Sequence, residues 1–257
     1  MEKLGTGARM ISEDFADTGW QIVHDGSPVT RYQVFGERAS GTGFIDRLLG
    51  RNTALASTEA LGWKHALPHM TVIPEDTAAI CVIRHAEDWA RAMHARPWHC
   101  PPAMQELEFS AFLRAEWATI ADRARYFPQA MALGGAGRAL QCDRHPLTGL
   151  PYANLFQLRR AKIEGLLSFF NRGCTMILCR LEAVQGAPRD FVAAIEKRLS
   201  LPASPEGFHP VTRRLGARFL PAIDPRPATP PKLSDTDRTF LHSQLDLGRE
   251  AELGYRY

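Results

Sequence analysis

The chain has 257 residues, 45% of them hydrophobic and 23% charged, so it can bury a substantial core in one large domain or two small ones. Its net charge of +3 is small and dispersed, which argues against nucleic acid as a partner. No apolar stretch is long enough to cross a bilayer, and the N-terminus lacks the apolar region of a secretory signal. Five cysteines without a C-x-x-C pair indicate reduced thiols, so we expect a cytoplasmic protein.

Segments typical of strands and helices alternate along the first 200 residues. In chain order, the apolar patterns predict a strand over 32–35, a helix after residue 42, a strand over 78–83, helices over 105–127 and 154–170, a strand over 175–179, and a helix after Pro188.

The loop between the first predicted strand and helix has the composition of an anion-binding site. The apolar run ends at Gly36, a polar loop bounded by glycines follows, and an amphipathic segment begins at Thr42. Free backbone N–H groups and the helix dipole favour a phosphate at such a helix start, and glycines let the backbone approach it. We expect Arg38 to face solvent there and to add a permanent positive charge. An ordinary tight turn between strand and helix is the alternative.

The loop lacks the Gly-Lys-Ser/Thr ending of P-loop nucleoside triphosphatases, because Thr42 stands where the lysine should be. Its Arg-Ala-Ser-Gly-Thr sequence instead resembles the 5′-phosphosulfate loop of sulfotransferases that use 3′-phosphoadenosine 5′-phosphosulfate. The resemblance implies that the 5′-phosphosulfate is held by Gly36, Arg38, Ala39, Ser40, Gly41, Thr42 and Gly43.

The segment Trp63-Lys64-His65-Ala66-Leu67-Pro68 resembles the Lys-x-His-Leu-Pro segment of the same family, although here the lysine and histidine are adjacent. The resemblance implies that His65 is the base that removes the acceptor's proton. It also implies that Lys64 neutralises the charge that develops on the leaving group. A histidine that only makes a loop hydrogen bond is the alternative for His65.

Arg84 begins a segment that resembles the family's 3′-phosphate motif, an Arg-Asn-Pro-x-Asp sequence followed by a serine. Arg84 and Asp88 match, and Ala92 occupies the serine position, which removes a hydroxyl donor. Arg91 and Arg96 are candidates to replace that donor. Without the resemblance, we would interpret Arg84 as a partner in a structural ion pair.

The C-terminal part begins with a stretch rich in proline, since eight of the 18 prolines lie between Pro202 and Pro231. We expect an irregular loop over 202–231 and a last helix over 234–253. Within the loop, Arg213 and Arg214 resemble the family's Arg-Lys-Gly segment, which implies that they close over the 3′-phosphate.

The alternation of strands and helices predicts one α/β domain over residues 1–257, with a core at about 31–201. We expect three layers, with a mostly parallel central sheet flanked by helices. The resemblance implies that this is a P-loop-like fold.

The resemblance implies transfer of a sulfuryl group from 3′-phosphoadenosine 5′-phosphosulfate to a hydroxyl or amine of a glycan or small molecule. Two alternatives remain, a catalytically silent nucleotide-binding module and a P-loop phosphotransferase. No metal is expected, because His94, His99 and Cys100 lack zinc-ligand spacing, as do Cys142 and His145. The sequence does not indicate the oligomeric state.

Overall fold

A five-stranded sheet with the order β1-β5-β4-β2-β3 organises the computed structural model, which describes residues 10–212 and 218–257. Strands β2 to β5 pair in parallel and β1 pairs with β5 in antiparallel, so the prediction of a mostly parallel sheet is confirmed. The strands are β1 (Trp20–Val23), β2 (Arg31–Gly36), β3 (Ala56–Ser57), β4 (Thr77–Ile83) and β5 (Met176–Arg180).

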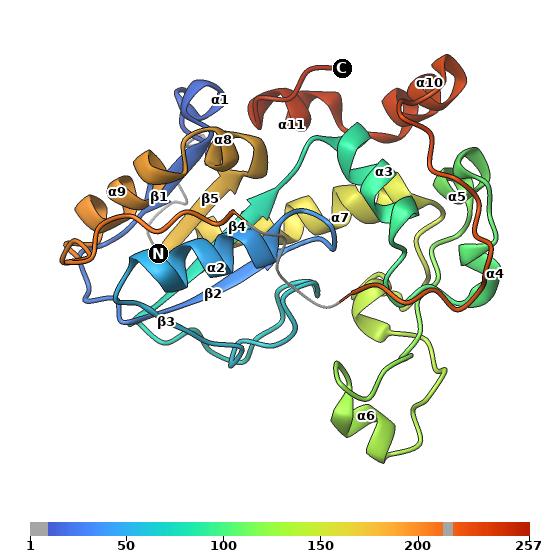
Figure 1. Cartoon of the computed structure of the whole chain (residues 1–257), viewed down its shortest axis with the longest axis horizontal. Helices are drawn as coiled ribbons and strands as arrows, with labels where there is room; N and C mark the ends of the chain where they lie inside the picture. The colour runs from blue at the N-terminus through green and yellow to red at the C-terminus, as the bar shows by residue number, and fades with distance from the viewer. Residues whose placement is uncertain (1–9, 213–217) are drawn as a thin grey trace, which may run out of the picture.

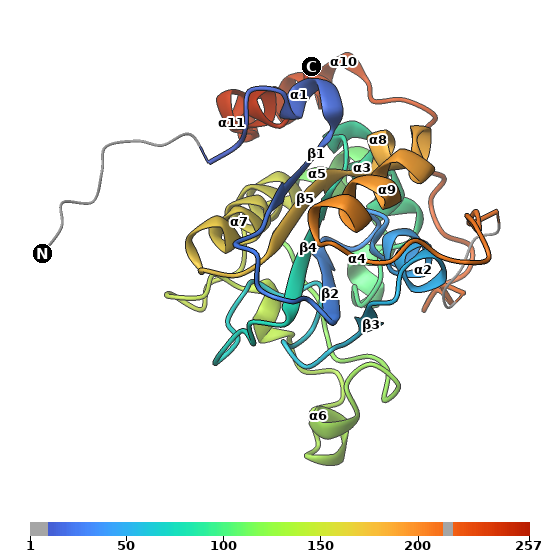
Figure 2. The ribbon, with the colours of Figure 1, turned by 90° about the vertical axis from the view of Figure 1, so that its left-hand side faces the viewer.

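Helices cover both faces of the sheet, as Figure 2 shows. They are α1 (Phe15–Thr18), α2 (Thr42–Asn52), α3 (Ala86–Ala95), α4 (Pro102–Gln105), α5 (Phe109–Arg114), α6 (Pro128–Ala132), α7 (Leu155–Leu167), α8 (Leu181–Gly186), α9 (Pro188–Arg198), α10 (Asp235–Gln244) and α11 (Leu247–Glu252). Alternate residues of β4 point to opposite faces. Ile80 packs in one core with α2 and α9, and Cys81 packs in a second core with α7.

The single helix predicted over 105–127 is wrong, because the chain is helical there only at the end of α4 and over α5. Helix α5 ends at Arg114 because Ala115 is extended, and the Trp117 amide donates to the Tyr152 carbonyl, 35 residues along the chain. Trp117 then packs in a third core with helices α3 and α5. Apolar residues that look periodic in the sequence are thus buried by an irregular segment, since tertiary contacts override a weak local preference.

Residues 119–140 form a lobe that carries α6 and extends away from the sheet (Figure 1). A bridge between Ile120 and Ala139 closes the base of the lobe. The sequence did not predict this lobe, and one of its residues, Tyr126, contributes to the wall of the main pocket.

The predicted irregular loop is confirmed, since the described part of residues 202–231 contains no helix or strand. The last predicted helix is instead two helices, α10 and α11, because the chain is extended at Leu245. Within the described ranges, no helix combines the length and apolarity that crossing a membrane requires.

Candidate functional site

The loop after β2 runs from strand to helix as predicted. Gly36 ends the strand, and a Cβ atom there would lie 2.6 Å from the Val82 carbonyl oxygen and 2.7 Å from Ser40 Oγ. Gly41 caps α2 at φ +95°, where its missing Cβ would meet the Leu181 side chain. Close packing and left-handed backbone geometry therefore require these two glycines.

Gly36→Ala should lower the free energy of unfolding by about 1–3 kcal/mol, because the new methyl group meets backbone that cannot move freely. Chemical denaturation followed by circular dichroism measures this. The matched control is Gly50→Ala inside α2, where the nearest atom is 3.4 Å away and stability should rise by up to about 1 kcal/mol. Equal stability of the two variants would mean that the loop has more room at Gly36 than its contacts show.

A pocket of about 530 Å³ opens where this loop follows β2 and where Arg84 follows β4. Ligands bind at the carboxyl ends of strands in such sheets. Its wall brings together many of the residues that the sequence singled out, namely Arg38, Ala39, Gly41, Thr42, Gly43, Lys64, His65 and Arg84.

Three other predicted residues do not line this pocket, namely Gly36, Ser40 and Ala92. The Ser40 hydroxyl is buried and donates to the Glu37 carbonyl at 2.6 Å, so the loop uses it internally. Ala92 lies on α3, away from the wall, so a missing hydroxyl at this position removes no contact with a ligand in the pocket. Arg213 and Arg214 lie outside the described residues.

The two residues considered as replacements for that hydroxyl differ in position. Arg91 pairs with Asp88 and donates to the Pro231 carbonyl, outside the pocket. Arg96, five residues further along the chain and just past the end of α3, lines the pocket. Arg96 is therefore the better placed of the two.

Arg38 does not face solvent, so that expectation is wrong. Its side chain is only 2% exposed, and Nη2 lies 2.7 Å from Asp143 Oδ2. The guanidinium carbon also lies 5.5 Å from the Trp63 ring and 5.6 Å from the Trp117 ring. Nε and Nη1 make no hydrogen bond to any residue within 10–212 or 218–257. An arginine in the wall of the pocket is thus held by a carboxylate that is distant in sequence.

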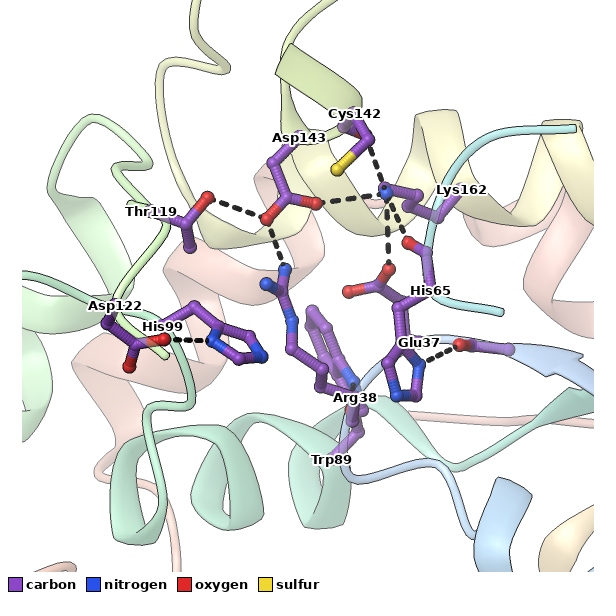
Figure 3. Close-up of polar contacts among 11 residues, drawn as sticks. Glu37, Arg38, His65, Trp89, His99, Thr119, Asp122, Cys142, Asp143 and Lys162 are labelled. Carbon is purple, nitrogen blue, oxygen red and sulfur yellow. Dashed lines mark hydrogen bonds and ion pairs between the residues drawn. The ribbon is translucent and has the colours of Figure 1, made fainter. Parts of the chain in front are cut away.

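Asp143 links this arginine to Lys162 of α7, as Figure 3 shows. Burial alone would raise the pKa of Asp143, but the charges of Arg38 and Lys162 outweigh burial and hold it well below its usual range. Thr119 Oγ1 also donates to the Asp143 carboxylate at 2.7 Å. Asp143 therefore stays ionised at neutral pH and fixes both cations.

Lys162 ties the predicted His65 segment to this buried cluster. Its Nζ donates to the His65 carbonyl at 2.6 Å, to the Cys142 carbonyl at 3.1 Å and to Asp143 Oδ1 at 3.0 Å. Since an ammonium group has three donors, all of them are used. Lys162 is 3% exposed, so this buried ammonium group holds the backbone of the His65 segment in place from the protein interior.

Glu37 is the second acid of the cluster, with Oε1 3.7 Å from Lys162 Nζ. Burial raises the pKa of Glu37, and Lys162 and Arg38 only partly oppose this effect. Neither carboxyl oxygen has a hydrogen-bond partner among the described residues. Arg38, Asp143 and Lys162 together carry one net positive charge, and the raised pKa of Glu37 reduces the extent to which Glu37 cancels it.

His65 is held as a neutral imidazole. Its Nδ1 lies 2.6 Å from the Gly36 carbonyl oxygen, so this nitrogen carries the proton and Nε2 can accept one. Burial, with added repulsion from Lys64 and Arg38, lowers the pKa of His65 well below its ordinary value. The Lys64 carbonyl accepts from the Gly36 amide at 3.0 Å, which fixes this segment against β2.

Arg84 supports the loop from the end of β4. Its Nη1 donates to the Ala39 carbonyl at 2.9 Å, and Trp89 Nε1 donates to the Arg38 carbonyl at 2.9 Å. Ala39 has a left-handed φ of +62°, which the contact of Arg84 with its carbonyl helps to hold. These two carbonyls therefore face Trp89 of α3 and Arg84. The N-terminus of α2 has no side-chain cap, and its first residues line the pocket.

Aromatic side chains form part of the pocket wall. Trp63, Trp98, His99 and Tyr126 line it, and His99 Nδ1 lies 2.6 Å from Asp122 Oδ1. The sequence contains no signal for this pair, because the two residues are 23 positions apart and lie in irregular segments.

The chain was compared with known protein families, curated proteins and solved structures. No protein-family model, no curated protein and no solved structure matches the chain. No group of three or more His, Cys, Asp or Glu side chains in the described part of the chain is placed to hold a metal ion. The geometry of the pocket is therefore the basis for a functional proposal.

Proposed function

We propose that the chain transfers a sulfuryl group from 3′-phosphoadenosine 5′-phosphosulfate to an acceptor hydroxyl. The observation that carries this proposal is the convergence, on one pocket, of the uncapped α2 N-terminus, Lys64 and Arg84. They come from three separate segments, in the order that the family resemblance implies. The tight turn from β2 into α2 fits a P-loop-like arrangement.

A donor with phosphate at both ends needs two cationic sites. The amides of Thr42 and Gly43 with Lys64 supply one for the 5′-phosphosulfate. Arg84, with Arg96 on the same wall, supplies one for the 3′-phosphate. A guanidinium has five N–H donors, and Arg84 uses one of them on the Ala39 carbonyl.

In the proposed reaction, the acceptor oxygen attacks sulfur in line. The bond from sulfur to the bridging phosphate oxygen breaks, and adenosine 3′,5′-bisphosphate leaves. Lys64 neutralises the charge that develops on that oxygen. A neutral histidine of the pocket takes the acceptor's proton, and the sequence motif assigns this role to His65.

Two alternatives are weaker. A P-loop phosphotransferase would need a lysine where Thr42 stands. A catalytically silent nucleotide-binding module of the same fold would need the same phosphate sites, but it would not need Lys64 or a histidine in the pocket. The pocket contains both a lysine and histidines, which favours the enzyme.

Nucleotide binding tests the donor assignment. Adenosine 3′,5′-bisphosphate should bind without a divalent metal and more tightly than AMP, and calorimetry compares the two. Arg84→Gln should weaken bisphosphate binding roughly tenfold or more and AMP binding by less, because it removes a charged contact to the extra phosphate in addition to its support of the loop.

The matched control is Arg31→Gln, which removes an exposed arginine at the opposite end of β2 and should alter neither affinity. Equal affinity of the parent chain for the two nucleotides, or a strict need for magnesium, would contradict the donor assignment.

A further inference from the structure

The pocket holds a second histidine whose surroundings differ from those of His65. His99 is 4% exposed, and its Nδ1 is hydrogen-bonded to Asp122, whose side chain is 20% exposed. Figure 3 shows the His99 ring between Asp122 and Arg38. Because the carboxylate accepts the Nδ1 proton, Nε2 carries the lone pair. No residue in the described ranges makes a hydrogen bond to Nε2.

His99 has a strained backbone conformation. Its φ is +66°, a left-handed value that residues other than glycine rarely adopt. The Ile120 amide donates to the His99 carbonyl at 2.8 Å, and the Cys100 amide donates to Pro97, so the neighbouring chain enforces the conformation. Strain of this kind concentrates at functional sites.

Aromatic rings surround His99 on the pocket side. Its ring centroid lies 5.7 Å from that of Trp63, 6.2 Å from that of Trp98 and 5.4 Å from that of Tyr126. All three rings also line the pocket. This part of the wall therefore fits a flat acceptor ring, which packs favourably against aromatic side chains.

The two histidines differ in the charges around them and in the partner of Nδ1. Protonated His65 would face Lys64, Arg38 and Lys162, and its Nδ1 partner is a carbonyl without charge. Protonated His99 would be paired with the Asp122 carboxylate at 2.6 Å. An acid that orients an imidazole and stabilises its protonated form is the arrangement of a general base in hydrolases.

We propose that His99, oriented by Asp122, is the base that takes the proton from a hydroxyl group on a ring-shaped acceptor. This inference rests on the proposed sulfuryl transfer. The acceptor oxygen forms the new bond to sulfur, the bond to the bridging phosphate oxygen breaks, and the hydroxyl proton moves to His99 Nε2. Asp122 is then a positioning residue, and His65 remains neutral beside the loop.

Two phenols test this assignment, because a base is needed only for an acceptor that still carries its proton. Phenol, with a pKa of about 10, keeps its proton at neutral pH, whereas pentafluorophenol is ionised. The experiment measures single-turnover transfer from 3′-phosphoadenosine 5′-phosphosulfate to each phenol. The variants are His99→Asn, Asp122→Asn and His65→Gln. Asparagine is chosen at position 99 because it tolerates a left-handed backbone.

His99→Asn should lower the rate with phenol by roughly 10²–10⁴ and change the rate with pentafluorophenol little. Asp122→Asn should shift the ratio of the two rates in the same direction. Because the Asp122 side chain is partly exposed, we expect this variant to fold, so it provides the test even if His99→Asn does not fold. His65→Gln should leave the ratio unchanged. Bisphosphate affinity should match that of the parent chain in folded His99→Asn and Asp122→Asn.

Other outcomes overturn the inference in distinguishable ways. Equal loss with both phenols in His99→Asn would make His99 structural, and a ratio that changes only in His65→Gln would make His65 the base. A parent chain that binds the bisphosphate but uses neither phenol would exclude a ring-shaped acceptor and leave the donor assignment standing. A parent chain that does not bind the bisphosphate would refute the proposed function itself.

Discussion

Asp143→Ala should lower the free energy of unfolding by about 3–5 kcal/mol, the largest stability loss that we expect from one substitution in this chain. The change removes the carboxylate that faces Arg38 and Lys162, both of which are buried. Breaking a buried ion pair is costly because the remaining charges have neither water nor a partner. Urea denaturation of parent and variant measures the difference.

Asp76→Ala is the matched control, since it removes an aspartate whose arginine partner, Arg31, is exposed, and it should change stability little. Asp143 should contribute fully above its unfolded pKa of about 3.9, because its folded pKa is lower. The difference between parent and Asp143→Ala should therefore be constant near neutral pH and shrink as the pH falls below about 4. Similar losses at Asp76 and Asp143 would contradict the role of burial.

Lys64→Ala should lower the rate of sulfuryl transfer by roughly 10²–10³, the effect typical of removing one group that stabilises developing charge. Donor affinity should also fall, since the lysine lies on the pocket wall where the bridging oxygen would be. Single-turnover release of adenosine 3′,5′-bisphosphate gives the rate, and calorimetry gives the affinity.

Lys197→Ala is the control for Lys64→Ala, because it removes the same charge from an exposed position on α9. Lys64→Arg should recover part of the rate, since it keeps the charge but not its position. If Lys64→Ala and Lys197→Ala transferred sulfuryl at the same rate, the leaving group would have to be neutralised by another residue.

Some of the candidate site could be predicted because its signals are local. The apolar run at 78–83 became β4, and the glycine-bounded loop joins β2 to α2 as expected. Arg38, Lys64 and Arg84, which follow β2, β3 and β4 along the chain, line one pocket. In a parallel sheet the carboxyl ends of neighbouring strands lie at one edge, so segments that follow those strands meet there.

The direction of each side chain within the site could not be predicted in this way. Arg38 turned inward because Asp143, 105 positions later, offers a buried carboxylate, and no local pattern connects the two residues. Ser40 turned its hydroxyl to Glu37, within its own loop. A buried charge adopts the position in which it is paired, and that position depends on which distant segments pack beside it.

The sequence by itself determined the alternation of strands and helices and the loop before α2, because hydrophobic periodicity and glycine spacing act over a few residues. Only the tertiary structure decided the irregular course of 115–127, the lobe around α6 and the pairing of His99 with Asp122. These features depend on contacts between residues far apart in the chain or in irregular segments. Such contacts form only when packing offsets the conformational entropy lost on ordering the chain.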